Sequence, residues 1–167
     1  MSLSKAFTTS KSQNWCTPKH IWKKFEQDYG VTFIRDLCSS KENHICAEFY
    51  TEKQDCRYRS WRLTWENQAN WCNPPYGTGI IPDLARLAHR IRNKTNTVFL
   101  VPCNKTDQKW FHEYAVGSAL ILFVEGRISF LENSTPIKGN SQGSMLICFG
   151  PAFESGIGSF KQDKEIV

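Results

Sequence analysis

The 167-residue chain lacks close cysteine pairs, long apolar runs and internal repeats. None of its seven cysteines belongs to a C-x-x-C pair, so zinc ribbons and knuckles are not expected and no metal site is predicted. The odd cysteine count, without a secretory signal, argues against a disulfide framework and favours reduced thiols packed as small hydrophobic groups. Apolar runs such as 119–124 are far too short to span a membrane, which predicts a soluble, cytoplasmic protein.

No linker or low-complexity tract divides the chain, and 40% hydrophobic with 13% aromatic residues is the composition of a globular protein. We therefore predict one domain over residues 15–150. Residues 1–14 are expected to form a polar, flexible lead-in, and residues 151–167 a weakly patterned tail. The net charge of +5 is compatible with a polyanionic partner without identifying one, and nothing indicates an obligatory protein partner.

Apolar periodicity predicts alternating strands and helices. Strands are expected at 31–37, 44–50, 69–72, 96–102, 118–126, 127–131 and 144–149, with a tight turn at Gly126 and with 144–149 as the last strand. Helices are expected at 18–29, 80–92 and 107–116, the first with Thr17 as its N-cap and Gly30 at its end. This alternation indicates an α/β fold with a three-layer, mostly parallel sheet and an antiparallel edge strand.

The most informative short segment is Asn73-Pro74-Pro75-Tyr76, directly after the strand expected at 69–72. The prolines donate no N–H, but their carbonyls remain acceptors, and the Asn73 side chain supplies another acceptor oxygen. If that oxygen and the Pro74 carbonyl face one cavity, they can hold both hydrogens of a planar NH₂ group. They would then stabilise the positive charge that develops as the nitrogen attacks an electrophilic methyl group. Tyr76 offers a face for stacking. The alternative is an ordinary strand end with Tyr76 packed inward.

Basic and aromatic residues alternate in the segment 57–65, and a polar loop is expected at 132–143. Guanidinium groups can meet phosphates, and aromatic faces can accept unstacked bases. The candidates for nucleic-acid contact are Arg57, Arg59, Arg62, Arg127, Lys138 and Asn140. The alternative is a solvated basic face above buried tryptophans, with a mobile loop.

An ordered set of motifs runs from residue 15 to residue 149. They are W-x-T-P (15–18), Asp36, Asp55, N-P-P-Y (73–76), L-V-P (100–102), T-D-x-x-W-F (106–111), G-R-x-x-F (126–130) and Ser144. In this set the chain resembles the phage-type, Dam-like DNA N6-adenine methyltransferases. The N-P-P-Y motif alone occurs in several families of amino-methyltransferases, but the ordered set is much more specific.

The resemblance implies a Rossmann-like class I methyltransferase sheet with S-adenosyl-L-methionine as cofactor and DNA as partner. It also implies action in the host cytoplasm if a phage encodes the chain. Cofactor contacts are then expected from Trp15, Thr17, Pro18, Asp36, Cys38, Asp55 and Asn73. A carboxylate at position 36 can pair with the cofactor's α-ammonium group, and Asp55 would contact the adenosine. The sequence departs from many methyltransferases in having CSSKEN, without glycine, after the first strand.

The expected reaction is methyl transfer to adenine N6 in DNA after base flipping, with short or relaxed sequence specificity. A second enzymatic interpretation is methylation of cytosine N4, of RNA or of a protein glutamine, because N-P-P-Y occurs in enzymes of those kinds. A third interpretation, from another class, is a non-catalytic nucleic-acid-binding protein on the same fold. It predicts DNA binding without cofactor binding.

Overall fold

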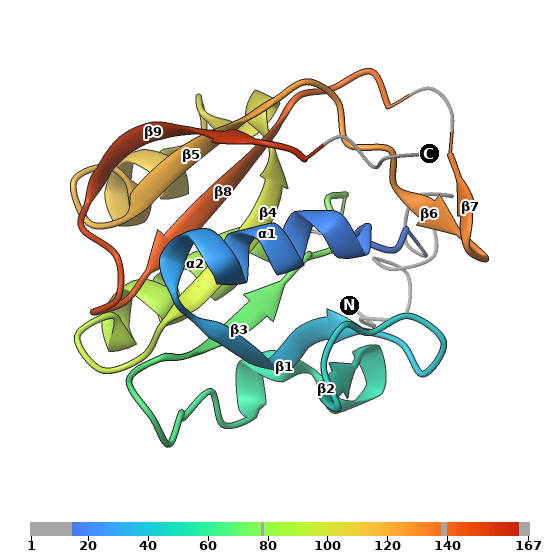
Figure 1. Cartoon of the computed structure of the whole chain (residues 1–167). Coiled ribbons are helices and arrows are strands. Elements are labelled where there is room, and N and C mark those ends of the chain that lie inside the picture. The colour runs from blue at the N-terminus through green and yellow to red at the C-terminus, as the bar shows by residue number, and fades with distance from the viewer. Residues whose placement is uncertain (1–14, 78, 138–139, 164–167) are drawn as a thin grey trace.

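The computed structural model describes residues 15–77, 79–137 and 140–163, and these contain one seven-stranded sheet with the strand order β2-β1-β3-β4-β8-β5-β9 (Figure 1). The predicted lead-in lies outside the described residues. The strands of this sheet are β1 (Thr32–Ser39), β2 (Glu48–Thr51), β3 (Gln68–Cys72), β4 (Thr97–Pro102), β5 (Leu120–Glu125), β8 (Ser144–Phe149) and β9 (Gly156–Lys161).

The sheet is mostly parallel, as predicted. Neighbouring strands from β2 to β4 run parallel, and so do β5 and β9, whereas β8 runs antiparallel to both β4 and β5. The antiparallel strand is therefore on the side formed by the late part of the chain. It is not the outermost strand, however, because β5 and β9 lie beyond it.

Helices cover both faces of the sheet and make it the middle of three layers. Figure 1 shows α1 (Lys19–Tyr29) lying across one face. Its side chains Ile21 and Phe25 belong to a core that includes Val98 and Leu100 of β4. The alternate β4 residues Phe99 and Val101 belong to a second core, with α2 (Ile81–Ile91) and the π-helix η6 (Phe111–Ala115). Successive side chains of a strand point to opposite faces, so the fully buried β4 supplies both cores.

The first helix ends at Gly30 as predicted, with φ 65° at that glycine. The predicted N-cap is wrong, because the helix begins at Lys19 with Pro18 in the capping position and no side-chain capping bond. The Thr17 hydroxyl therefore does not cap the helix and contacts Asn73 instead. No helix among the described residues has the length and apolar character needed to cross a membrane.

The sheet continues beyond the predicted last strand. Residues 151–167 were expected to be a tail, but residues 156–161 form β9 at the edge of the sheet. Phe160 of β9 and Phe153 before it are buried against Phe25 of α1, with ring centroids 6.1 and 5.8 Å away. The chain turns toward this edge at Gly150, which has φ +133°. There a Cβ atom would lie 2.3 Å from Oδ1 of Asn96.

Two other local predictions fail for identifiable reasons. The strand pair around Gly126 is wrong, because β5 ends at Glu125 and the next pairing is the hairpin of β6 (Leu131–Glu132) and β7 (Thr135–Pro136). Gly126 has φ 78° and redirects the chain away from β5. The helix expected at 107–116 is reduced to η6 with a short lead-in, after a turn at 103–105.

The connection from β1 to β2 contains no helix. Residues 40–47 make the whole crossover between these parallel strands, which is shorter than the usual minimum of about 10–12 residues. The short path is possible because Glu48, the first residue of β2, pairs with Arg35 in the middle of β1. The segment therefore folds back along β1, and its residues lie at the carboxyl end of the strand.

Candidate active site

The 73–76 turn follows β3 at the carboxyl edge of the parallel strands. Strand β3 lies between β1 and β4, and the chain moves from β2 across β1 to reach it. The crevice between β1 and β3 is therefore the point where the strand order reverses, which is the usual place for a ligand in an open α/β sheet. Pro74 is buried, and Asn73, Pro75 and Tyr76 are half-buried. The sequence prediction that Asn73 stands at a strand end is confirmed.

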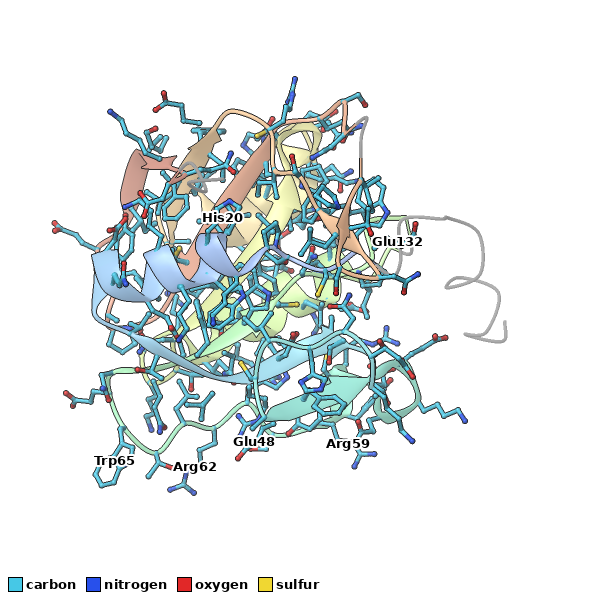
Figure 2. All side chains as sticks on the ribbon, turned by 45° about the vertical axis from the view of Figure 1, so that its right-hand side comes forward. His20, Glu48, Arg59, Arg62, Trp65 and Glu132 are labelled. Carbon is cyan, nitrogen blue, oxygen red and sulfur yellow. The ribbon has the colours of Figure 1, made fainter. Side chains whose placement is uncertain are left out.

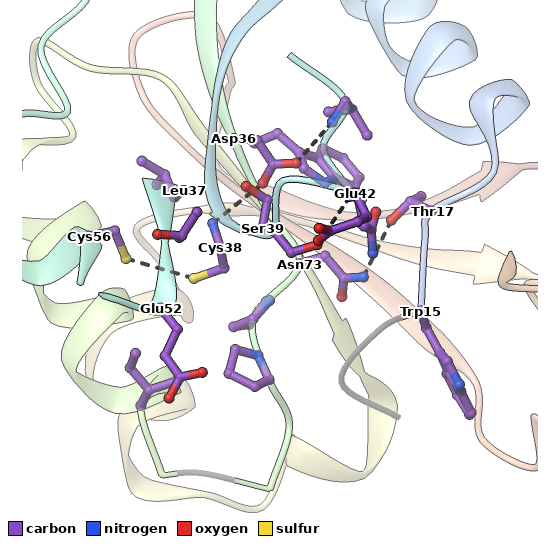
Figure 3. Close-up of a pocket in the computed structure, with 18 of the residues that line it drawn as sticks. Trp15, Thr17, Asp36, Leu37, Cys38, Ser39, Glu42, Glu52, Cys56 and Asn73 are labelled. Atoms are coloured by element: carbon purple, nitrogen blue, oxygen red, sulfur yellow. Dashed lines mark hydrogen bonds between the residues drawn. The ribbon is translucent and has the colours of Figure 1, made fainter. Parts of the chain in front are cut away.

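Hydrogen bonds hold the Asn73 amide on both sides. The Tyr76 hydroxyl donates to Asn73 Oδ1 at 2.7 Å and also lies 3.3 Å from the carbonyl oxygen of Leu100. Asn73 Nδ2 donates to Thr17 Oγ1 at 3.4 Å, as Figure 3 shows. Burial raises the pKa of the Tyr76 hydroxyl well above its usual range, so this group stays protonated. The amide is thus linked to residues 56 positions earlier and three positions later in the chain.

A pocket of about 410 Å³, here called the larger pocket, lies at this edge and has Asn73 in its wall. Its other walls are the end of β1 with the 40–43 segment, the residues that follow β2, and the segment 15–17. The predicted cofactor residues Trp15, Thr17, Asp36, Cys38, Asp55 and Asn73 all line it. Pro18 does not, and takes the capping position before α1 instead. In the described part of the chain, no group of three His, Cys, Asp or Glu side chains is arranged to hold a metal ion.

Asp36 is a buried carboxylate in the wall of the larger pocket, with 4% of its surface exposed. The strand predicted at 31–37 continues to Ser39 as β1, so Asp36 lies inside it. Its oxygens accept hydrogen bonds from the backbone N–H groups of Cys38 (3.4 Å) and Ile45 (3.1 Å). No ion pair of the described residues involves Asp36. Burial raises the pKa of this carboxyl group to about 7, and the two backbone N–H groups offset only part of that effect.

Asp55 has a different environment in the wall of the same pocket. Both of its carboxylate oxygens accept hydrogen bonds from the Arg57 guanidinium, at 2.9 and 2.7 Å. Arg57 also contacts Asp83 of α2 at 3.2 Å. The hydrogen bonds from Arg57 lower the pKa of Asp55. The sequence interpretation treated the two residues separately, as cofactor ligand and DNA contact, whereas the structure pairs them.

Three thiols meet beside the 73–76 turn. Cys38 Sγ lies 3.7 Å from Cys56 Sγ, and Cys72 directly precedes Asn73. All seven cysteines are free, as predicted. Contact with Cys38 and burial raise the pKa of Cys56, and burial raises the pKa of Cys72 to about 11. These thiols are neutral at ordinary pH, so Cys38 and Cys56, which line the larger pocket, contribute an uncharged, polarizable surface to its wall.

A smaller pocket of about 330 Å³ shares Trp15, Tyr76 and Phe130 with the larger one. Trp15 stacks on Phe130 with ring centroids 5.6 Å apart. Cys16 forms a β-bridge with Leu131, through backbone hydrogen bonds of 2.7 and 3.0 Å, which holds this segment beside the β6–β7 hairpin. The remaining walls are mainly polar and come from residues 102–105 and 140–144.

A sequence-family model described as DNA N-6-adenine-methyltransferase (Dam) matches residues 4–166. The chain belongs to this family.

Among the curated relatives of this Dam-family chain is the DNA N-6-adenine-methyltransferase of Escherichia phage T1. The two are 26% identical over 151 residues, which cover 79% of this chain. The chain spans 60% of the length of that relative.

The predicted DNA contacts of this family member fall into separate regions. Asn140 lines the smaller pocket, and Arg127 is exposed beside it, since a Cβ atom on Gly143 would lie 3.0 Å from Arg127 Nη1. Figure 2 shows Arg62 and Trp65 together on one exposed loop, with Arg59 farther along the molecule. The loop with Arg62 precedes β3, at the end of that strand opposite to the 73–76 turn. Lys138 lies outside the described residues.

Sequence reasoning missed several residues in the wall of the larger pocket. Glu52 is the first residue after β2, and its carboxylate is exposed at the pocket (Figure 3). Three more wall residues lie at the end of β1 and in the segment after it, where the sequence has no glycine-rich turn. They are Ser39, Ser40 and Asn43. Glu52 could have been found from its position, because acidic residues after the second strand of dinucleotide-binding folds bind ribose hydroxyls. The strand predicted at 44–50 corresponds to β2, which ends at Thr51, directly before Glu52.

Proposed function

We propose that this chain transfers a methyl group from S-adenosyl-L-methionine to N6 of an adenine in DNA, on a Rossmann-like class I methyltransferase fold. The observation that carries the proposal is the position of Asn73. Its amide lies in the wall of the larger pocket at the reversal point of the sheet, and Tyr76 of the same turn lines both pockets. The family match and the phage T1 relative support adenine in DNA over other amines.

The residues of the larger pocket fit the proposed cofactor. Its volume of about 410 Å³ is within the range of about 300–1,000 Å³ for small-molecule sites. Asp36 is a buried carboxylate that forms no ion pair with any described residue, which suits an α-ammonium group. Glu52 would accept hydrogen bonds from ribose hydroxyls, and the Cys38 and Cys56 thiols would pack against the nucleoside. When bound, the cofactor supplies an electrophilic methyl group on a sulfonium sulfur.

Asn73 and Pro74 would hold the target amine. We expect Asn73 Oδ1 and the Pro74 carbonyl oxygen to accept the two hydrogens of N6, which favours the geometry with a free lone pair on nitrogen. A carbonyl oxygen has two lone pairs, so Oδ1 can bind the amine while Tyr76 still donates to it. The product loses a proton to water after transfer, so no strong general base is required beside Asn73.

The smaller pocket would receive the extruded adenine. Tyr76, predicted to offer a face for stacking, lines this pocket, and its hydroxyl donates to Asn73 Oδ1 and lies 3.3 Å from the Leu100 carbonyl oxygen. The stacked pair of Trp15 and Phe130 offers a second aromatic surface in this pocket. Arg127 and Asn140 lie on the same side and are the DNA contacts that we retain. We propose that the reaction takes place in the cytoplasm where DNA is accessible, which is the host cytoplasm if a phage encodes the chain.

Mass spectrometry of nucleosides from DNA of cells that express the chain tests the proposal. We expect N6-methyladenine with the wild type and none with Asn73→Ala. Calorimetry with S-adenosylhomocysteine should give similar affinities for both proteins, because the variant removes the amine acceptor and not Asp36. Methylation at cytosine N4, or in RNA or protein only, would assign another amine substrate. DNA binding without any cofactor binding would show a non-catalytic protein.

A further inference from the structure

The hydroxyl groups of Thr17 and Tyr76 bind the two ends of one amide. In the structure, these two hydrogen bonds run in the same direction. The Tyr76 hydroxyl donates to Asn73 Oδ1, and Asn73 Nδ2 donates to Thr17 Oγ1. Thr17 is buried, with 5% of its surface exposed, and lines the larger pocket. Among the described residues its side chain has this one hydrogen-bond contact. The hydroxyl proton of Thr17 is therefore left without a protein acceptor in the part of the chain that the structure describes.

A half-turn of the amide would reverse the chain of hydrogen bonds. Nδ2 and Oδ1 would exchange positions, so Thr17 would donate to Oδ1 and Nδ2 would donate to the Tyr76 oxygen. Tyr76 could then donate to the Leu100 carbonyl oxygen, which already lies 3.3 Å away. In the reversed arrangement, the hydroxyl protons of both Thr17 and Tyr76 have acceptors inside the protein. Hydroxyl groups both donate and accept, so the two hydroxyl groups are compatible with either orientation.

Only one of the two orientations can hold the target amine. With Oδ1 at its observed position beside Tyr76, the amide presents an acceptor to N6. In the reversed orientation it presents an N–H donor to the amine's own hydrogens, and no hydrogen bond forms. The orientation that suits catalysis is thus the one in which the Thr17 proton lacks a protein acceptor. An anionic group in the larger pocket would supply the missing acceptor.

We propose that Thr17 is a positioning residue, which selects the reactive orientation of the Asn73 amide when the carboxylate of the cofactor's methionine part accepts its hydroxyl proton. This inference rests on the proposed function. Once the hydroxyl donates to a carboxylate, it can only accept from Asn73, so Nδ2 must face Thr17 and Oδ1 must face the amine. Occupation of the larger pocket then prepares the site for adenine, and the two ligands bind with positive cooperativity.

The backbone around Thr17 keeps its hydroxyl in place. Cys16 is bridged to Leu131 on one side, and α1 begins at Lys19 on the other. Because Thr17 does not cap α1, its hydroxyl is not needed for the helix. Replacement by valine keeps the shape of the side chain and removes only the hydroxyl, so the variant is expected to fold.

Fluorescence anisotropy with a labelled, mixed-sequence DNA duplex at constant ionic strength measures the cooperativity. S-adenosylhomocysteine should tighten DNA binding by the wild type about fivefold or more. Saturating 5′-deoxy-5′-methylthioadenosine lacks the carboxylate and should change it less than twofold. Thr17→Val should lose the effect of S-adenosylhomocysteine and Thr17→Ser should keep it. Thr32→Val, at the exposed first position of β1, is the matched control and should behave as wild type.

The orientation of the amide can also be observed directly. In protein labelled with ¹⁵N-asparagine, the Asn73 side-chain signals, identified by their loss in Asn73→Asp, should shift with S-adenosylhomocysteine and not with methylthioadenosine. Equal responses to the two compounds, or full cooperativity in Thr17→Val, would overturn the role of Thr17 while leaving methyl transfer intact. A wild type that binds no S-adenosylhomocysteine would overturn this inference together with the proposed function.

Discussion

Asp36 and Asp55 both line the larger pocket, but only Asp55 has a cation beside it among the described residues. Asp55 gives both oxygens to Arg57, and its pKa is lowered. Asp36 has two backbone N–H donors and a pKa raised to about 7. A carboxylate that already pairs with a cation is stabilised little by a second cation on a ligand. A buried carboxylate without such a partner is stabilised much more. The position of an acidic residue at a pocket is therefore a weaker guide to ligand binding than its existing partners.

The largest effect should come from removing the charge of Asp36. Asp36→Asn should weaken S-adenosylhomocysteine binding at least about 30-fold, because loss of one partner of a buried charge pair costs about 2 kcal/mol or more. Calorimetry measures the affinity, and thermal unfolding checks that the variant is folded. An affinity within twofold of the wild type would remove Asp36 from the cofactor site.

A pH series should separate the two aspartates without any mutation. The Asp36 carboxyl, with its pKa of about 7, must lose its proton to pair with an ammonium group, so binding weakens below that pH. The affinity for S-adenosylhomocysteine should rise about tenfold from pH 6 to pH 8 and then level off. Asp55 is already ionised over this range because its pKa is lowered, so it adds no slope. Asp36→Asn should show a flat profile, and a slope that persists in this variant would contradict the assignment.

Glu52 should contribute a smaller part of the affinity. Glu52→Gln should weaken S-adenosylhomocysteine binding about fivefold, because an exposed carboxylate loses about 1 kcal/mol of hydrogen bonding to ribose hydroxyls. Glu48→Gln is the matched control, since Glu48 lies in β2, pairs with Arg35 and does not line the pocket. Equal losses in the two variants would indicate a general charge effect rather than a contact.

The smallest effect on binding is expected at Asp55. Asp55→Asn should change the affinity for S-adenosylhomocysteine less than about twofold. It should instead lower the free energy of unfolding by about 1 kcal/mol at neutral pH, because Arg57 loses one of the two ion pairs that it forms with described residues and keeps the one with Asp83. The lowered pKa of Asp55 means that this stability is present above its unfolded pKa and is lost as the pH falls through the folded value. A tenfold loss of affinity with unchanged stability would restore Asp55 as a ligand.

Local patterns in the sequence predicted the central part of the fold. The continuous apolar run of β4, the apolar stripe of α1 and the short strand before the 73–76 turn were all predicted, and all are confirmed. Strand β9 was missed because Gly156, Gly158 and the exposed Ile157 leave it without an alternating apolar pattern. Its place in the sheet comes from pairing with β5 and from the packing of its Phe160 on Phe25, and both contacts involve residues that are distant in the sequence.

The location of the candidate site could be predicted from the sequence, but the hydrogen bonds and ion pairs within it could not. Asn73 and Asp36 belong to strands whose carboxyl ends must meet in a parallel sheet, so their proximity followed from the predicted topology. The pairing of Asp55 with Arg57 depends on a left-handed backbone at Asp55, with φ 47°, which no sequence pattern announced. The contact between Thr17 and Asn73 spans 56 positions and requires the exact placement of α1.

The residues that follow Gly150 limit how far the chain can be shortened. A truncation at that residue would follow the motif boundaries and spare every residue of both pockets. It would nevertheless remove Phe153 and Phe160 from beneath Phe25, and would uncover the edge of β5. The loosened helix is the one that begins two residues after Thr17. Such a fragment would keep every pocket residue but would lack the packing that fixes α1 on the sheet. We expect it to aggregate through the uncovered edge of β5.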